Sequence, residues 1–282
     1  MIYIVDNYNT TTAKELSIKF NCSSSFIGKV WMKNNLSGKL KNFYKLNDSY
    51  FNKINSPDKA YFLGLILSDG CIYTRNEECQ SWVSLGLQEK DEHILQEFKQ
   101  YLDYDKPLYS AKREIEKTRV ISSMKVLQIV SDEMVNDLRS LGITERKTWN
   151  CDFPEIPSNL RRYMVRGFFD GDGGVSKTRG GINKSDYTLT FCGNTYTINY
   201  IENILTENNI KFAKVKCNPE KYSHDFYSIN IFNTRSIYSF YTIFYKNGDN
   251  DNLKLKRKEN LFNSFLNASQ RCKTIGYNTK EA

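Results

Sequence analysis

The same series of hydrophobic and polar patterns occurs twice along the chain after residue 55. Each copy opens with a nearly continuous apolar segment, as expected of a buried helix. Segments that alternate between apolar and polar residues follow it, and these predict strands with one buried face. Between the strands lie segments with apolar residues three and four positions apart, which predict amphipathic helices. The recurrence predicts an internal repeat of one folding unit.

The two copies predict the same order of elements: helix, strand, strand, helix, strand, strand, helix. In the first copy, the opening helix is followed by expected strands at 71–75 and 82–88, a helix at 91–102, strands at 107–110 and 121–130, and a helix at 131–141. In the second copy, the expected strands lie at 175–179, 187–193, 212–217 and 226–232, the helices at 194–208 and 234–245, and a basic stretch at 253–258. Because the connections between successive strands are too short for parallel crossovers, we predict an α+β fold with antiparallel sheets.

The two apolar segments contain matching nonapeptides, FLGLILSDG at 62–70 and VRGFFDGDG at 165–173. Each has a glycine at its third position, Gly64 in the first copy and Gly167 in the second. A glycine inside a helix costs about 1 kcal/mol relative to alanine, so a compensating close approach of two backbones is expected. The pattern therefore predicts that the two helices cross at their glycines.

Each nonapeptide ends in Asp-Gly, and the crossing would bring Asp69 and Asp172 side by side. A carboxylate at a helix C-terminus faces the negative end of the dipole, and a second carboxylate adds repulsion. A divalent cation between the two would offset both effects, and oxygen ligands favour Mg²⁺, which keeps several waters and binds phosphate. The alternative is that each Asp-Gly pair only ends its helix in a turn.

The paired nonapeptides and the order of elements resemble those of the LAGLIDADG homing endonucleases, over roughly residues 55 to 268. The resemblance implies a monomeric, pseudo-twofold pair of αββαββα domains whose saddle-shaped sheets grip the major groove of double-stranded DNA. It also implies that Asp69 and Asp172 bind Mg²⁺ and that each supports hydrolysis of one strand, in the setting of intron homing. A group I intron RNA maturase, with host intron RNA as its partner, and a DNA-binding regulator that does not cleave remain as alternatives.

The resemblance assigns further active-site positions. Lysines near the scissile phosphates correspond to Lys147 in the first half and to Lys256 or Lys258 in the second, with simple phosphate contact as the alternative. Two polar residues that follow an alternating strand, Gln88 and Asn194, are candidates for positioning water, although helix capping is the stronger expectation for Asn194.

The sequence departs from the family pattern at the sixth motif position. This position is usually acidic in the family, but here it is Leu67 in the first copy and Asp170 in the second. The difference leaves the metal-binding position unchanged. We therefore do not interpret it as a loss of activity.

The charge of the chain agrees with a nucleic-acid partner, since the net charge is +8 and the pI is about 8.9. Basic residues recur on the expected strands, where alternate positions share one face of a sheet. This pattern predicts a basic and polar face toward the DNA. The candidate DNA-binding residues are Arg75, Lys112, Arg113, Lys117, Arg119, Lys125, Lys177, Arg179, Lys184, Lys214 and Lys216.

The first 46 residues predict a separate unit with two helices. A capping box at 12–15 opens a helix that runs to Phe20, with Leu16 and Phe20 expected on one face. After a turn at 21–23, a second helix at 24–34 would place Ser24, Ser25 and Lys29 on its outer side, as in the recognition helix of a helix-turn-helix. No third helix is evident from the sequence. The expected domains are 1–46, 47–153 and 154–272, with a C-terminal tail at 273–282.

Several other classes of protein are excluded by what the sequence lacks. Its seven cysteines form no C-x-x-C pair, which argues against a zinc site or a disulfide framework and favours a reducing, intracellular setting. The two histidines, His93 and His224, are too few for a histidine-rich metal centre, and no phosphate-binding G-x-x-x-x-G-K-[ST] loop occurs. The longest apolar run, 60–67, is far shorter than the span of about 20 residues that a membrane requires, and no signal peptide is expected.

Overall fold

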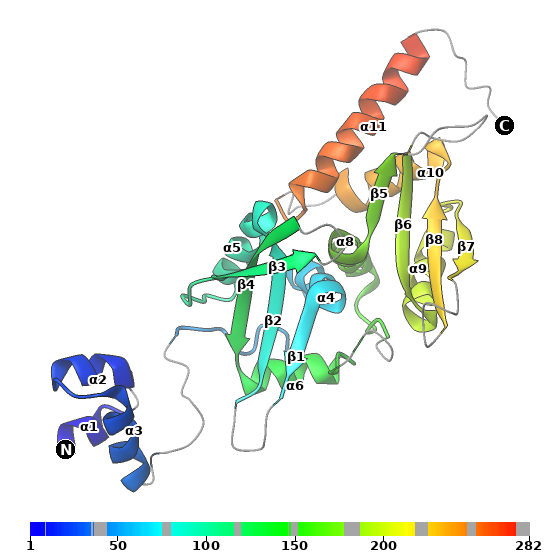
Figure 1. Cartoon of the computed structure of the whole chain (residues 1–282). Helices are drawn as coiled ribbons and strands as arrows, with labels where there is room; N and C mark the ends of the chain where they lie inside the picture. Colours follow the sequence, from blue (N-terminus) through cyan, green and yellow to red (C-terminus); the bar gives the residue numbers. More distant parts are fainter. Residues whose placement is uncertain are drawn as a thin grey trace.

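Two four-stranded antiparallel sheets and the helices packed against them make up most of the protein (Figure 1). The computed structural model describes residues 1–8, 10–34, 36, 44–74, 80–115, 120–145, 147, 152–177, 187–217, 225–246 and 252–274. Each sheet is built from two hairpins joined through a helix, and the same topology occurs in both halves. The predicted internal repeat and the α+β class are therefore confirmed.

The first half begins with α4, whose sequence is apolar on nearly all sides and which is accordingly buried from Ala60 to Ser68. Its elements are α4 (Pro57–Asp69), β1 (Gly70–Tyr73), β2 (Trp82–Gln88), η1 (Glu89–Asp91), α5 (Glu92–Tyr101), β3 (Tyr109–Ile115), β4 (Val120–Val130) and α6 (Asp132–Ser140). The strand order in the sheet is β1-β2-β4-β3. Ser131 caps α6 by accepting a hydrogen bond from the Met134 amide, and Gly142 follows the helix with a φ of 83°.

The second half repeats this order and adds a long C-terminal helix. Its elements are η2 (Ser158–Leu160), α8 (Arg161–Asp172), β5 (Gly174–Lys177), β6 (Tyr187–Asn194), α9 (Thr195–Glu207), β7 (Ala213–Lys216), β8 (Phe226–Ile231), α10 (Thr234–Tyr241), the π-helical η3 (Thr242–Lys246) and α11 (Lys256–Thr274). The strand order, β5-β6-β8-β7, matches that of the first sheet.

The helix α11 extends the basic stretch that was predicted at 253–258. Its inner face carries Phe262 and Phe265, which are buried in the core of the second half. Leu255, Phe262 and Phe265 are spaced by seven and three positions, a helical periodicity that the sequence already contained. Among the described residues, no helix combines the length and the apolar character needed to cross a membrane.

One hydrophobic core runs through both halves. The strands turn alternate residues inward, so that Val83, Leu85 and Leu87 of β2 are buried together. In the second sheet, Leu189 and Phe191 of β6 take the corresponding positions. The helices cover this inner face of each sheet, and no helix of the described part of the chain lies on the opposite face (Figure 1).

The N-terminal residues form a unit of three short helices, α1 (Ile2–Asp6), α2 (Ala13–Lys19) and α3 (Ser24–Lys33). This unit has its own small core, which consists of Ile4, Leu16, Ile27 and Val30. The expectation of only two helices was wrong, because α1 supplies the third. Leu16 is buried in this core, whereas Phe20, at the C-terminal end of α2, is 43% exposed and contacts Tyr3 on α1.

Candidate active site

The helices α4 and α8 cross at the two glycines that the sequence singled out. A Cβ atom built on Gly64 would lie 1.9 Å from the carbonyl oxygen of Met164, and one built on Gly167 would lie 2.0 Å from the carbonyl oxygen of Tyr61. Neither distance leaves room for any side chain. The glycines therefore permit the two backbones to touch, which is the compensation that their helix-destabilising effect required.

A second close contact lies one turn further along each helix, which the sequence analysis did not identify. A Cβ atom on Gly171 would lie 1.9 Å from the Oγ of Ser68 and 2.9 Å from the Oδ2 of Asp69. The carboxylate of Asp69 thus lies over the residue that precedes Asp172. The signal was present in the sequence, since Gly64 and Ser68, like Gly167 and Gly171, are small residues four positions apart on one helix face.

The crossing brings Asp69 and Asp172 together at the exposed ends of the two helices. Both side chains reach solvent, but the protein around them displaces much of the neighbouring water. This burial raises the pKa of Asp69 to about 6, and repulsion from Asp172 adds to the rise, although Lys147 and Lys258 oppose it. Burial raises the pKa of Asp172 as well, against the attraction of the same two lysines. The carboxylates of Asp69 and Asp172, one from each half, are therefore both disfavoured by burial and both stabilised by the same two lysines.

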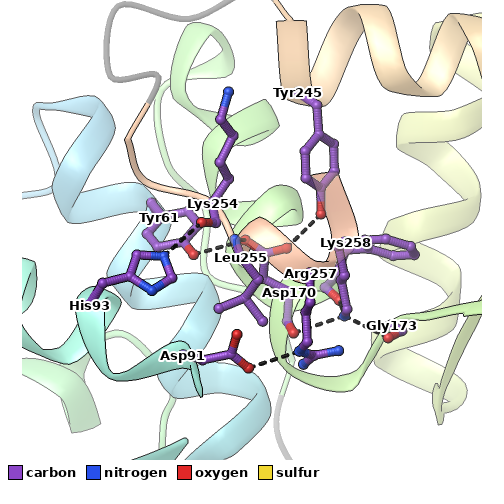
Figure 2. Close-up of polar contacts among 11 residues, drawn as sticks. Tyr61, Asp91, His93, Asp170, Gly173, Tyr245, Lys254, Leu255, Arg257 and Lys258 are labelled. Atoms are coloured by element: carbon purple, nitrogen blue, oxygen red, sulfur yellow. Dashed lines mark hydrogen bonds and ion pairs between the residues drawn. The ribbon is translucent and has the colours of Figure 1, made fainter. Parts of the chain in front are cut away.

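Lys147 and Lys258 lie at equivalent places beneath these helix ends. The ammonium group of Lys147 donates to the carbonyl oxygens of Leu67, at 2.7 Å, and Ser68. The ammonium group of Lys258 donates to those of Phe169, Asp170 (2.8 Å) and Gly173 (2.6 Å) (Figure 2). Each lysine thus binds carbonyl groups at the C-terminal end of a helix, where intrahelical donors run out, although the Phe169 carbonyl also accepts from the Gly173 amide.

The two candidate lysines of α11, Lys256 and Lys258, differ in their surroundings. Lys258 is 1% exposed, and burial lowers its pKa to about 8. Of the two candidates on α11, Lys256 and Lys258, it is Lys258 that lies next to both aspartates. Lys258 therefore occupies the place in the second half that Lys147 occupies in the first. Lys256, the first residue of α11, is exposed.

Gln88 and Asn194 occupy equivalent ends of β2 and β6 but differ in their contacts. Asn194 is buried, and its side-chain oxygen accepts a hydrogen bond of 2.9 Å from the Thr197 amide, so it caps α9 as expected. Gln88 is exposed and its side chain makes no capping hydrogen bond to η1. Only Gln88 is thus oriented toward solvent.

Asp170, the acidic residue at the sixth motif position, faces away from the solvent and is fully buried. Its carboxylate accepts hydrogen bonds from the hydroxyl of Tyr61 (2.8 Å), the hydroxyl of Tyr245 (2.6 Å) and the amide of Leu255 (2.9 Å) (Figure 2). These donors come from α4, from η3 and from the segment before α11. Asp170 therefore ties the two halves together beneath the aspartate pair.

A further contact between the halves lies beside this network (Figure 2). The carboxylate of Asp91, which is 2% exposed, pairs with the Nε of Arg257 at 2.8 Å. Because the N-terminus of α5 carries Asp91 and the first turn of α11 carries Arg257, this ion pair fixes the start of α11 against the first half. The same turn of α11 carries Lys258.

The strand register places four of the candidate DNA-binding lysines on the side of each sheet that the helices cover, and not on the helix-free face. Lys125 pairs with Leu87 across the sheet and lies near Glu89 and Glu92, and Lys214 pairs with Ile229 and binds Glu202 of α9 at 2.7 Å. Both therefore lie on the helix-bearing side. By the same alternation, Lys112 and Lys216 share that side, and Lys216 binds Asp225.

The remaining candidates are placed less fully. Lys177 is exposed at the end of β5. Arg113 lies on β3, where its backbone pairs with Ser122 of β4. The other five candidates lie outside the described residues: Arg75, Lys117, Arg119, Arg179 and Lys184.

The helix-free faces carry mainly hydroxyl, amide and aromatic side chains. In the second sheet, Thr190 donates to the side-chain oxygen of Asn230 at 3.0 Å, and Asn230 donates to the hydroxyl of Ser228 at 3.2 Å. In the first sheet, Tyr73 stacks on Trp82 beside Ser84. Such groups can both donate and accept hydrogen bonds, as readout of base edges requires.

The aspartate pair has the donor set of a hard-cation site. Its ligand atoms are carboxylate oxygens, and burial raises the pKa of both carboxyl groups, so their charged forms are disfavoured when no cation is bound. No cluster of three or more His, Cys, Asp or Glu side chains occurs among the described residues. Two carboxylates fit Mg²⁺, which commonly binds to one or two of them and completes its shell with water and phosphate oxygens.

Comparison with known proteins identifies the fold. No protein-family model and no curated protein matches the sequence. Among solved structures, the LAGLIDADG homing endonuclease I-SmaMI bound to cleaved DNA aligns with 81% of this chain and 93% of its own, at 11% identity and a TM-score of 0.52. The homing endonuclease I-WcaI bound to its DNA recognition sequence covers 69% of this chain and 84% of its own, at 15% identity and a TM-score of 0.49. The similarity to the I-SmaMI structure shows that the chain has the fold of the LAGLIDADG homing endonucleases.

Proposed function

We propose that the protein is a site-specific DNA endonuclease that hydrolyses one phosphodiester bond in each strand of a double-stranded target. The observation that carries the proposal is the convergence of Asp69 and Asp172, one from each half, at the solvent-exposed ends of two crossed helices. The fold supports it, because the similar I-SmaMI structure contains cleaved DNA. Both halves lie in one chain, so the site needs no second copy.

Asp69 and Asp172 would together hold Mg²⁺ at the crossing. When bound, the ion would activate water and offset negative charge on the phosphate. The protein supplies the geometry, because the touching backbones at Gly64 and Gly167 fix the distance between the carboxylates. Asp69 is ionised at neutral pH, since its pKa is about 6.

Lys147 and Lys258 would act mainly by holding the helix ends. Their ammonium groups contact backbone carbonyls of the turns that carry the two aspartates. The positive charges also lie close enough to the carboxylates to favour their ionised forms. They are therefore positioning residues that prepare the site for a cation and a phosphate group.

The helix-free faces of the two sheets would contact the DNA. Their uncharged hydrogen-bonding groups, such as Thr190, Ser228 and Asn230, suit contacts to base edges in the major groove. The corresponding positions of the first sheet include the aromatic pair Tyr73 and Trp82. Because the two faces differ, the target should be asymmetric.

A direct test combines selection of a target with removal of the carboxylates. The purified full chain would be incubated with a library of circular DNA that carries randomised inserts, with Mg²⁺ or with EDTA, and the ends of linearised products would be sequenced. We expect Mg²⁺-dependent cleavage at one asymmetric sequence, and its loss in Asp69→Asn and in Asp172→Asn. Asp103→Asn is the matched control, because the side chain of Asp103 forms an exposed ion pair with Lys45 and the residue has a φ of 48°, which asparagine tolerates.

Three results would contradict the proposal. Sequence-specific binding without any nick at any divalent-ion concentration would instead identify a DNA-binding regulator. Cleavage that persists in both aspartate variants would show that the chemistry lies elsewhere. Accelerated splicing of an intron RNA that survives both substitutions, with no DNA cleavage, would identify a maturase.

A further inference from the structure

We propose that the N-terminal helices α1, α2 and α3 form a separate DNA-binding unit, which places the outer face of α3 in the major groove of double-stranded DNA. If the sheets also bind DNA, as proposed above, the complete target is bipartite, with a second block of sequence read by α3. The α3 face consists of Ser25, Gly28, Lys29, Met32 and Lys33.

The unit has the internal structure that an independent module requires. Its core residues Ile4, Leu16, Ile27 and Val30 contact one another and belong to no other cluster. The side chain of Trp31 donates to the Ile4 carbonyl at 2.9 Å, which fixes α1 against α3.

The connection between α2 and α3 has the form of a helix-turn-helix. A capping box starts α2, with the Glu15 amide donating to Thr12 and the Glu15 carboxylate accepting from the Thr12 amide. The turn contains Asn21 in the left-handed conformation, with a φ of 48°. Ser23 then caps α3 by accepting a hydrogen bond of 3.1 Å from the Phe26 amide. Such a short turn presents the second helix to a partner, as in DNA-binding proteins.

Gly28 is the residue on the α3 face that the fold itself does not explain. A helical glycine is less favourable than alanine by about 1 kcal/mol. At Gly64 and Gly167 the touching helices demand glycine, but a Cβ atom on Gly28 would meet nothing within 4 Å. An open glycine in the middle of an exposed face permits close approach of a partner from outside. In DNA-binding helices this position can lie against the bases or the sugar-phosphate backbone.

The chemistry around Gly28 favours DNA as that partner. Ser25 and Lys29 are exposed on either side of it, and Lys33 extends the positive charge along the helix. Residues 1–34 contain four lysines and only two acidic residues, neither of which lies on α3. The apolar side chains of Met32, on the face, and of Phe26, beside it, are 59% and 48% exposed and are available for contact with thymine methyl groups.

The experiment compares sequence selection by four full-length proteins in EDTA, where cleavage does not interfere. These are the wild type, Lys29→Glu, Gly28→Leu and the control Lys99→Glu, which makes the same charge reversal on α5. Each would select duplexes from a randomised library, and binding of the wild-type consensus would be measured by fluorescence anisotropy. Gly28→Leu should stay folded, because its surroundings are open and leucine favours helix, and circular dichroism would verify this.

We expect the wild type and Lys99→Glu to select two separated blocks of sequence. Both α3 variants should lose one block, keep the other, and bind the wild-type consensus about tenfold more weakly. If all four proteins select the same sequences with equal affinity, the inference is overturned while the proposed endonuclease can stand. If the α3 variants lose a block but Mg²⁺ never produces cleavage of the consensus, the inference stands and the proposed endonuclease fails.

Discussion

Replacement of Gly64 by alanine would place a methyl group where α4 and α8 leave no room for one. The new Cβ atom would lie 1.9 Å from the Met164 carbonyl oxygen, whereas such contacts are essentially never shorter than 3.0 Å, so the helices must separate by about 1.1 Å (3.0 − 1.9). Because the obstructing atoms are backbone, no side-chain rotation can relieve the contact. Overpacking of this kind costs about 3 kcal/mol at the upper end of its usual range. The better helix propensity of alanine offsets about 1 kcal/mol of this cost, so we expect the free energy of unfolding to fall by about 2 kcal/mol.

The same separation would displace the aspartate pair that we propose to be catalytic. The carboxylate of Asp69 is little more than one turn beyond Gly64, and misplacement by about 1 Å can reduce a reaction rate by about 100-fold. Chemical denaturation would measure the stability, and single-turnover cleavage of the selected target would measure the rate. Gly28→Ala is the matched control for stability, because the same substitution at an open helical glycine should stabilise its unit by up to about 1 kcal/mol. If Gly64→Ala were as stabilising as Gly28→Ala, the packed crossing of α4 and α8 would be refuted.

Further predictions concern the groups around the crossing. Asp170→Leu, which copies the residue of the first motif, should destabilise the protein by about 4 kcal/mol in denaturation experiments, because three buried donors lose their acceptor. Lys258→Met should lower stability by about 2–4 kcal/mol through unpaired carbonyls, whereas Lys256→Met at an exposed site should change it by less than about 0.5 kcal/mol. At low Mg²⁺ concentration, single-turnover rates should fall as the pH drops through about 6, because protonation of Asp69 removes a metal ligand. A higher Mg²⁺ concentration should move the midpoint of this pH–rate curve to lower pH. A midpoint that does not move with Mg²⁺ would count against metal binding by Asp69. The raised pKa also means that ionised Asp69 disfavours the fold, so Asp69→Asn should increase Tm above pH 6 and lose this advantage as the pH falls toward 4.

The sequence was sufficient for the features that depend on local pattern. The alternating run at 82–88 coincides with β2, and the capping residues Ser131 and Asn194 lie where the helices α6 and α9 begin. The crossing at Gly64 and Gly167 was predictable because an interior glycine without a partner would only destabilise its helix. In each case one local requirement, such as strand alternation, helix capping or close backbone approach, determines the residue type at that position.

The features that depend on register and on distant partners were not predictable in the same way. Shifting a strand by one residue reverses the side to which its side chains point, so the sequence alone could not place Lys125 and Lys214 on the helix-bearing side. The helix α1 is only five residues long and carries little periodicity of its own. It is stable through its contact with Trp31, which is remote in the sequence.

The sixth motif position shows why two halves with one topology need not be energetically equivalent. The side chain of Leu67 contributes apolar packing to the end of α4, whereas the side chain of Asp170 anchors the corresponding turn of α8 to groups from both halves. Burial of a carboxylate is unfavourable unless its hydrogen bonds are complete, and here two hydroxyls and an amide complete them. The turn that carries Asp172 is therefore held from below by Asp170 and Lys258 together, while the turn that carries Asp69 depends on Lys147. Because the supports differ while Gly64 and Gly167 fix the crossing, the shared geometry of the aspartate pair resides in the backbone contact and not in symmetric side chains.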